Sequence, residues 1–249
     1  MGVQDSLFFP VLGVILSNAL YFSSFPVVVK AARRGHLGSL NVLPQALMVV
    51  STNAWMCYAL SVPNKFIMLS NLPGAVAAVG FIVVTLPLIP RSDGRSRIQV
   101  QAVLVLGTAI MLCLWSGLIF GGASHAQRTF VLGAYGSAIC VLLFASPLST
   151  MGEVIATRNS VSIYAPLTAT QVTNCLMWTV YGLAIGDVWV YGPNGAGLAL
   201  GLVQLFLKVI YPVRPIEAAG RDHDHSSDRE QDHLKEICSD SDTADGRLP

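Results

Sequence analysis

Charged side chains are scarce in most of this sequence. Only 12% of the 249 residues are Asp, Glu, Lys or Arg, whereas a soluble domain carries about 25%. Four of the 14 acidic residues precede position 216, and the other ten fall in the last 34 positions. With 53% hydrophobic residues and a mean hydropathy of +0.59, the composition is that of an integral membrane protein with a polar tail.

The chain also lacks the residue patterns of several functional classes. Its five cysteines include no C-x-x-C pair, and the two histidines that precede the tail, His36 and His125, fall in expected loops. The formal net charge is +1, and no basic cluster is interleaved with aromatic residues, which excludes a nucleic-acid groove. We therefore predict no enzymatic activity, no metal, no cofactor and no nucleic-acid partner.

Long apolar runs recur along the first 212 residues. A helix of around 20 mostly apolar residues crosses a hydrocarbon core of about 30 Å. This criterion predicts membrane-spanning helices at residues 7–29, 42–61, 66–89, 98–120, 129–152, 163–185 and 188–212. The connections after the second and the sixth span are so short that these spans must form tight hairpins with their successors.

Basic residues set the predicted orientation, because Lys and Arg in short loops are retained in the cytosol. Only Lys65 and Arg128 fall on one side of the predicted spans. The other side holds Lys30, Arg33, Arg34, Arg91, Arg95, Arg97, Arg158 and Arg214. We therefore predict the N-terminus outside and the C-terminus in the cytosol.

An internal repeat relates the two ends of the membrane-embedded part. Five residues recur 123 positions later, so that Trp55, Tyr58, Leu60, Asn71 and Gly74 match Trp178, Tyr181, Leu183, Asn194 and Gly197. Two three-helix units joined by one extra helix lie parallel in a membrane, and substrate sites of such proteins lie between the halves. We predict an all-α membrane protein of seven helices, arranged as three, one and three.

The predicted domains follow from this repeat. Residues 1–90 form the first three-helix repeat, residues 91–128 the linker helix with its flanking loops, and residues 129–215 the second repeat. Residues 216–249 are predicted to be a disordered acidic cytosolic tail, because they hold too few apolar residues to offset the entropy of ordering.

The repeated Trp and Asn side chains are the candidates for a binding site. At about 1.5 Å per helical residue, Trp55 and Asn71 lie at one depth, and Trp178 and Asn194 repeat this arrangement. An indole face suits the C–H face of a sugar ring, and an amide offers two donors and an acceptor to hydroxyl groups. Because no ionisable residue falls at that depth, we predict a neutral polyhydroxylated ligand and no ion coupling.

Prolines form a second symmetric set at the cytosolic end of the predicted helices. Allowing small slips in the repeat, Pro26 pairs with Pro147 and Pro44 with Pro166. Proline removes a helical hydrogen bond and permits bending. We therefore predict a hinge or gate below the cavity.

These motifs resemble the SWEET family of sugar transporters over about residues 7–212. The second repeat carries "SPLSTMGEVIATRNSVSIYAP", "NCLMWTVYG" and "GPNGAGLALGLVQLFLKVIYP", and the first keeps "SFPVVVK", "NVLP", "AWMCYAL" and "LSNLPGAV". The resemblance implies bidirectional facilitated diffusion of mono- or disaccharides by alternating access. The expected partners are the lipid bilayer and a sugar of the glucose, fructose or sucrose class. The expected location is the plasma membrane, with an endomembrane as the alternative, and a homo-oligomer remains open.

The resemblance also implies roles for single residues. It assigns the Trp and Asn pairs to the binding pocket and the four prolines to the cytosolic hinge. It pairs Tyr58 with Asp187 as the extracellular gate, and Lys65 lies near the position of a gate lysine without being in register. Ser51 and Asn174 precede the two tryptophans by one turn on the same helix face, so they are expected to line the pocket and tune its size. The larger Asn174 favours a monosaccharide.

Two alternatives use the same topology. A PQ-loop-type amino-acid transporter is favoured by "LPQAL" at residues 43–47, but such proteins need an acid within a span for proton coupling, and this sequence has none there. A seven-helix receptor would share the predicted orientation of both termini. The duplication and the two-residue connection at Gly186 and Asp187 are evidence against a receptor.

Overall fold

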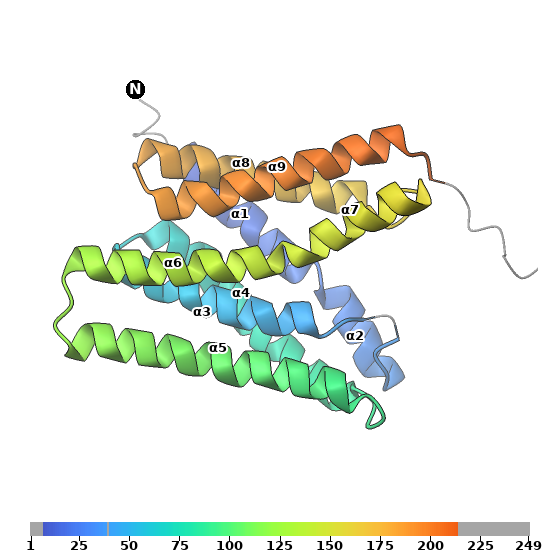
Figure 1. Cartoon of the computed structure of the whole chain (residues 1–249), viewed down its shortest axis with the longest axis horizontal. Coiled ribbons are helices and arrows are strands. Elements are labelled where there is room, and N and C mark those ends of the chain that lie inside the picture. The colour runs from blue at the N-terminus through green and yellow to red at the C-terminus, as the bar shows by residue number, and fades with distance from the viewer. Residues whose placement is uncertain (1–6, 39, 214–249) are drawn as a thin grey trace, which may run out of the picture. The chain divides into compact units, whose positions relative to one another are not determined.

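The computed structural model describes residues 7–38 and 40–213, and all regular elements in this part of the chain are helical (Figure 1). They are α1 Phe8–Phe22, α2 Phe25–Arg34, α3 Leu43–Ser61, α4 Lys65–Thr85, the 3-10 turn η2 Leu86–Leu88, α5 Gly94–Phe120, α6 His125–Leu143, α7 Ala145–Thr157, α8 Ala165–Ala184 and α9 Val188–Ile210. The predicted all-α fold is confirmed. The predicted acidic tail at 216–249 lies outside the described residues.

The first and the fifth predicted span are each built from two helices in line. Helix α1 ends at Phe22 and α2 begins at Phe25, while α6 ends at Leu143 and α7 begins two residues later. Pro26 and Pro147 lie near the starts of the second pieces, and proline cannot donate to the carbonyl four residues earlier. The break therefore falls just before each proline, and both rods continue beyond the predicted limits, to Arg34 and Thr157.

Five of the seven rods in the described chain are long and apolar enough to cross a membrane: Phe8–Arg34, Lys65–Leu88, Gly94–Phe120, His125–Thr157 and Val188–Ile210. Helices α3 and α8 have the length but are less apolar. They carry buried polar side chains, including Gln45, Ser51 and Thr52 on α3 and Asn174 on α8. A helix that faces protein and a polar cavity does not need a lipid-like surface on all sides.

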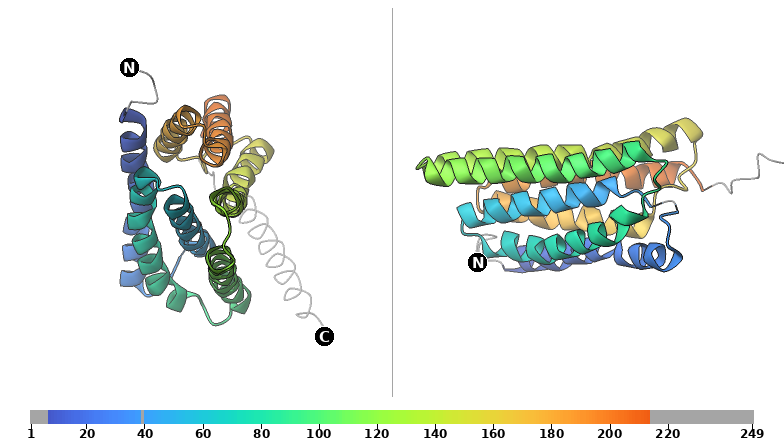
Figure 2. Two further views of the ribbon diagram at one scale, coloured as in Figure 1. Left: turned by 90° about the vertical axis from the view of Figure 1, so that its left-hand side faces the viewer. Right: turned by 90° about the horizontal axis from the view of Figure 1, so that it is seen from below.

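The helices of the two repeats are arranged alike in space, with the last helix of each repeat packed against the other two (Figure 2). In the first repeat α4 contacts both α1 and α3, and in the second α9 contacts α8 as well as α6 and α7. The halves meet where α1 packs against α8 and where α3 packs against α6. Helix α5 packs against α3 and α6, so it follows the first half in sequence and touches both halves in space.

Short connections close one end of this bundle, which we call the closed end. There α3 ends and α4 begins after residues 62–64, and α8 ends and α9 begins after residues 185–187. Gly186 has a φ of 69°, a left-handed conformation that glycine adopts without strain. Both predicted hairpins are confirmed. The opposite end, where α3 and α8 begin, is called the open end.

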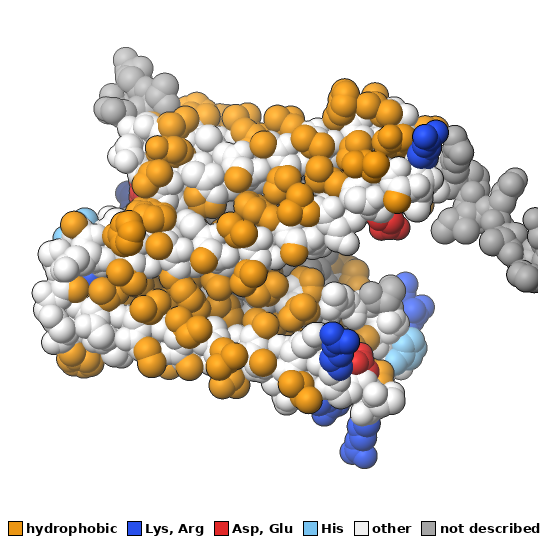
Figure 3. All heavy atoms as spheres, viewed as in Figure 1, with side chains coloured by type: hydrophobic (Ala, Val, Ile, Leu, Met, Phe, Trp, Pro, Cys, Tyr) orange, Lys and Arg blue, Asp and Glu red, His pale blue; other side chains and the backbone are white. Residues whose placement is uncertain are grey.

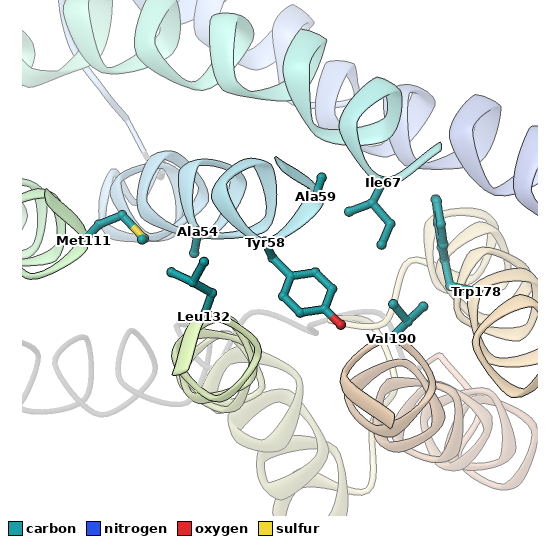
Figure 4. Close-up of a cluster of buried hydrophobic side chains, with 8 residues drawn as sticks. All are labelled: Ala54, Tyr58, Ala59, Ile67, Met111, Leu132, Trp178 and Val190. Carbon is teal, nitrogen blue, oxygen red and sulfur yellow. The ribbon is translucent and has the colours of Figure 1, made fainter. Parts of the chain in front are cut away.

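A buried apolar cluster lies near the closed end and joins both halves (Figure 4). It consists of Ala54, Tyr58, Ala59, Ile67, Met111, Leu132, Trp178 and Val190. Figure 4 shows the Tyr58 ring directed from α3 toward α9, between Leu132 and Val190. Tyr58 is fully buried at this level.

Candidate functional site

A cavity of about 600 Å³ lies between the two halves, within the size range of small-molecule sites. Its wall includes all six residues that were predicted from the sequence to bind the substrate: Ser51, Trp55, Asn71, Asn174, Trp178 and Asn194. From their level the wall continues along Pro44, Ser162 and Tyr164 toward the open end. At that end the surface is hollowed between α7 and α2 (Figure 3).

Each tryptophan of the site lies against a glycine of the opposite half. A Cβ atom at Gly13 of α1 would be 3.0 Å from the Trp178 ring, and one at Gly136 of α6 would be 3.3 Å from the Trp55 ring. Gly13 and Gly136 are themselves 123 positions apart. The indoles therefore occupy matched places between the halves, and Trp178, with 4% of its surface exposed, is an internal wall of the cavity.

Ser17 belongs to the site, although the sequence analysis did not identify it. The Trp178 indole N–H donates to Ser17 Oγ over 3.0 Å, and the Ser17 hydroxyl donates to Asn174 Oδ1 over 2.9 Å. The matched position in the second repeat is Cys140, whose thiol interacts with the Trp55 side chain. Both residues line the cavity, but the offset pairs a serine with a cysteine and so gives no sign of them in the sequence.

The two asparagines differ in their hydrogen bonds. Asn71 Nδ2 donates to the Ile67 carbonyl over 2.8 Å and to Ser70 Oγ over 2.9 Å, and Asn71 Oδ1 accepts from the Tyr21 hydroxyl over 3.1 Å. Asn194 Nδ2 donates to the Val190 carbonyl over 2.8 Å. Among the described residues the Asn194 carbonyl oxygen has no donor, so it is available to a ligand.

Tyr58 and Asp187 meet at the closed end, as the resemblance implied. The Tyr58 hydroxyl lies 2.7 Å from each carboxylate oxygen of Asp187 and donates to it. The same carboxylate accepts from the Trp189 backbone N–H and caps the first turn of α9. We call this contact between the halves the carboxylate bridge.

A second bridge lies beside it and was not predicted. Asn64 Nδ2 donates to the Tyr181 hydroxyl over 2.9 Å, while Asn64 Oδ1 caps α4 by accepting from the Phe66 and Ile67 backbone N–H groups. Asn64 and Tyr181 stand 123 positions from Asp187 and Tyr58, respectively. We call this contact the amide bridge. Lys65 lies over the Phe66 ring at 5.3 Å.

Aromatic contacts connect the bridges with the cavity. The ring centroids of Trp55 and Tyr58 are 5.6 Å apart, and those of Trp178 and Tyr181 are 5.8 Å apart, both in edge-to-face geometry. Such pairs contribute about 0.5–1.5 kcal/mol beyond the area that they bury. A displacement of either indole therefore changes the packing of the tyrosine one turn away, which forms the bridge.

The four prolines do not all converge on the cavity. Pro44 and Pro147 are part of its wall. Pro26 lies instead in a shallow surface depression with Lys30, Arg33 and Arg34, and Pro166 is an exposed residue at the start of α8. In this conformation the structure brings two of the four predicted hinge residues to the site.

Comparison with known proteins decides the family. A family profile, MtN3_slv, described as a sugar efflux transporter for intercellular exchange, matches residues 7–87 and 130–215. The bidirectional sugar transporter SWEET14 of Arabidopsis thaliana is 30% identical over 210 residues, covering 82% of this chain and 72% of that protein. The chain belongs to the SWEET family. The two matched stretches of this SWEET chain fall on either side of α5.

Other SWEET proteins are similar over the same region. The bidirectional sugar transporter SWEET11 of Arabidopsis thaliana is 26% identical over 204 residues, covering 82% of this chain and 70% of that protein. The sugar transporter SWEET1 of Caenorhabditis elegans is 26% identical over 203 residues, covering 80% of this chain and 63% of that protein. A solved eukaryotic SWEET transporter structure shares the fold, with a TM-score of 0.72, 24% identity, and coverage of 82% of this chain and 94% of that chain.

Proposed function

We propose that this SWEET protein transports a neutral mono- or disaccharide by bidirectional facilitated diffusion. The observation that carries the proposal is the cavity between the halves, with two indoles and two amides in matched positions on its wall. Indole faces bind the C–H faces of sugar rings, and amides bind hydroxyl groups. The names of the relatives, which are bidirectional sugar transporters, support the same function.

The lining of the cavity supports transport without ion coupling. The described residues that form its wall include no Asp, Glu, Lys, Arg or His. Charged residues inside membrane proteins usually mark ion pathways and proton relays. The carboxylate of Asp187 is engaged with Tyr58 at the closed end. A sugar is therefore expected to equilibrate across the membrane and not to accumulate.

The positions of the basic residues support an inward-open state. Lys30, Arg33 and Arg34 on α2, and Arg95 and Arg97 at the start of α5, all lie at the open end. Because Lys and Arg are retained in the cytosol, the open end is cytosolic and the closed end faces outward. The N-terminus is then outside, and the predicted membrane is the plasma membrane.

The site residues divide into four roles. Trp55, Trp178, Asn71 and Asn194 bind the sugar ring, Ser51 and Asn174 set the size of the pocket, and Tyr58 with Asp187 closes the outward side. Pro26, Pro44, Pro147 and Pro166 permit the inner helix ends to bend. Asn174 is fixed by its hydrogen bond from Ser17 and is 8% exposed. A fixed, bulky side chain at this place favours a monosaccharide, with glucose and fructose as the first candidates.

Counterflow into proteoliposomes tests this function. Vesicles preloaded with unlabelled sugar are given labelled glucose, fructose or sucrose outside, and the substrate is the sugar that exchanges. Asn194→Ala and Trp178→Ala should abolish exchange, whereas Leu202→Ala, on an exposed side chain of the same α9, should retain it. Accumulation of an amino acid driven by a proton gradient would instead identify a PQ-loop-type transporter.

A further inference from the structure

The two asparagines of the site are equivalent by sequence offset but not by chemistry. Asn71 uses both N–H groups of its amide within the protein, one for the Ile67 carbonyl and one for Ser70. Its carbonyl oxygen accepts from Tyr21. Asn194 keeps only the equivalent of the first bond, to the Val190 carbonyl. An amide has two donors and one acceptor oxygen, so Asn194 has free capacity of both kinds.

The cause of this difference is found at the matched positions. Residues 21 and 70 correspond, at the offset of 123, to residues 144 and 193. The first repeat has Tyr21 and Ser70, each with a hydroxyl that bonds to Asn71, and the second has Phe144 and Pro193, which carry none. Both hydroxyls are therefore present in the first repeat only.

The aromatic rings at these positions each lie against a matched glycine, the Tyr21 ring more closely than the Phe144 ring. A Cβ atom at Gly74 would collide with the Tyr21 ring, and one at Gly197 would lie 3.5 Å from the Phe144 ring. Gly74 and Gly197 also match at the offset of 123. Both rings line the cavity. The hydroxyl group is thus the main chemical difference between these two places.

We propose that Tyr21 lowers the affinity for sugar, because its hydroxyl donates to the Asn71 carbonyl oxygen where a sugar hydroxyl would otherwise bind. Asn194 is then the amide that binds the substrate in this conformation. A sugar that engages Asn71 must first displace the phenol. The inference rests on the proposed sugar transport. Tyr21 acts through Asn71, and the resulting binding site is one-sided despite the symmetric fold.

The direction of the effect follows from hydrogen-bond exchange. In the native protein a sugar hydroxyl that binds Asn71 replaces the hydrogen bond from Tyr21. The number of hydrogen bonds at Asn71 is unchanged, so the free energy of binding gains little. With phenylalanine at position 21 the Asn71 carbonyl oxygen has no protein donor, so the sugar displaces only water there and adds one hydrogen bond. One net hydrogen bond corresponds to roughly a two- to tenfold change in affinity.

Reciprocal exchange of the two aromatic residues tests the proposal. Tyr21→Phe should lower the apparent Kd for D-glucose or sucrose, measured by tryptophan fluorescence titration in nanodiscs, and the counterflow KM, each by roughly two- to tenfold. Phe144→Tyr, which places a hydroxyl beside Asn194, should raise both by a similar factor. Each variant places at one position the ring that the other repeat already accommodates, so the fold should tolerate both.

A double-mutant cycle separates competition from simple packing. Asn71→Ala should weaken binding less than Asn194→Ala in the native background. In the Tyr21→Phe background, Asn71→Ala should weaken binding about as much as Asn194→Ala does. A change in helix packing alone would not make the effect of Asn71→Ala depend on the hydroxyl at position 21.

The outcomes distinguish this inference from the proposed function. If the native protein binds neither sugar and exchanges none, the proposed function fails. If the native protein binds sugar but Tyr21→Phe leaves the affinity unchanged or weakens it, the inference alone is wrong, and Tyr21 orients Asn71 for the substrate. If Tyr21→Phe is not recovered as a monodisperse protein, Ser70→Ala, which frees one N–H of the same amide, must give tighter binding for the inference to stand.

Discussion

The Tyr58 hydroxyl lies 2.7 Å from both carboxylate oxygens of Asp187, across the interface between the two halves of the protein. Tyr58 is on α3 of the first half and Asp187 is the N-cap of α9 in the second. In the proposed orientation, an outward-open state requires these halves to separate at this end. The carboxylate bridge must then break, so its strength contributes directly to the equilibrium between the two states.

Tyr58→Phe should shift this equilibrium toward the outward-open state. The substitution retains the ring but removes the donor to a half-buried carboxylate, and a hydrogen bond to a charged group contributes about 1.5–3 kcal/mol. Spin labels at Leu60→Cys and Leu183→Cys, which replace exposed side chains at matched positions of the closed end, should report a longer distance population. The background lacks the native cysteines.

Tyr181→Phe is the matched control for this measurement. It removes the neutral amide bridge and retains the ring contacts with Trp178 and Phe66. A neutral hydrogen bond contributes about 0.5–1.5 kcal/mol, so a smaller shift is expected. Equal distance distributions in the native protein and Tyr58→Phe would mean that the carboxylate bridge does not hold the closed end together.

Asn64→Asp should have the opposite effect. Aspartate caps a helix as well as asparagine does, so α4 keeps its cap while the Tyr181 hydroxyl acquires a charged acceptor. The closed end is stabilised, and we expect slower counterflow with a larger inward-open fraction. Asn64→Ala loses both the cap and the bridge and should reduce the thermal stability as well. Faster exchange by Asn64→Asp would contradict this role of the amide bridge.

The sequence predicted the arrangement of the fold because the signals for it are local or periodic. Seven apolar runs give the helices, and the offset between Trp55 and Trp178 gives the repeat. The same offset brought the Trp and Asn side chains to one depth, and the structure places them on one cavity wall. The role of these residues and the domain limits remain predictions.

Two features that depend on contacts between the halves, Ser17 and the amide bridge, were not visible in the sequence. Ser17 is an ordinary residue of an apolar span, and its importance arises only because α1 packs against α8, where it meets Trp178 and Asn174. The amide bridge also depends on this packing. The break between α1 and α2 was missed because the hydropathy of the span continues through it, although Pro26 marked the place.

Gly13→Ala adds only one methyl group, but it should displace the Trp178 ring in the binding site. The new methyl group would lie 3.0 Å from the Trp178 ring, which is closer than a relaxed contact, and overpacking costs about 1–3 kcal/mol. We expect a lower melting temperature and a raised counterflow KM. Gly80→Ala in α4 is the control, because a Cβ atom there meets nothing within 4 Å. If both variants behave alike, the close approach of α1 to Trp178 is not needed for binding.

Pro147→Ala tests whether the break between α6 and α7 is needed for transport. Alanine at this position restores the N–H group that can donate to the Leu143 carbonyl, and it favours a continuous helix. The inner end of the rod then loses its bend and cannot close over the open end, so we expect counterflow to fall severalfold while sugar affinity changes little. Pro166→Ala provides the comparison, because Pro166 lies in the first turn of α8, where no helical hydrogen bond is lost. Native exchange rates in Pro147→Ala would show that alternation does not depend on this bend, and the proposed hinge would then have to lie elsewhere.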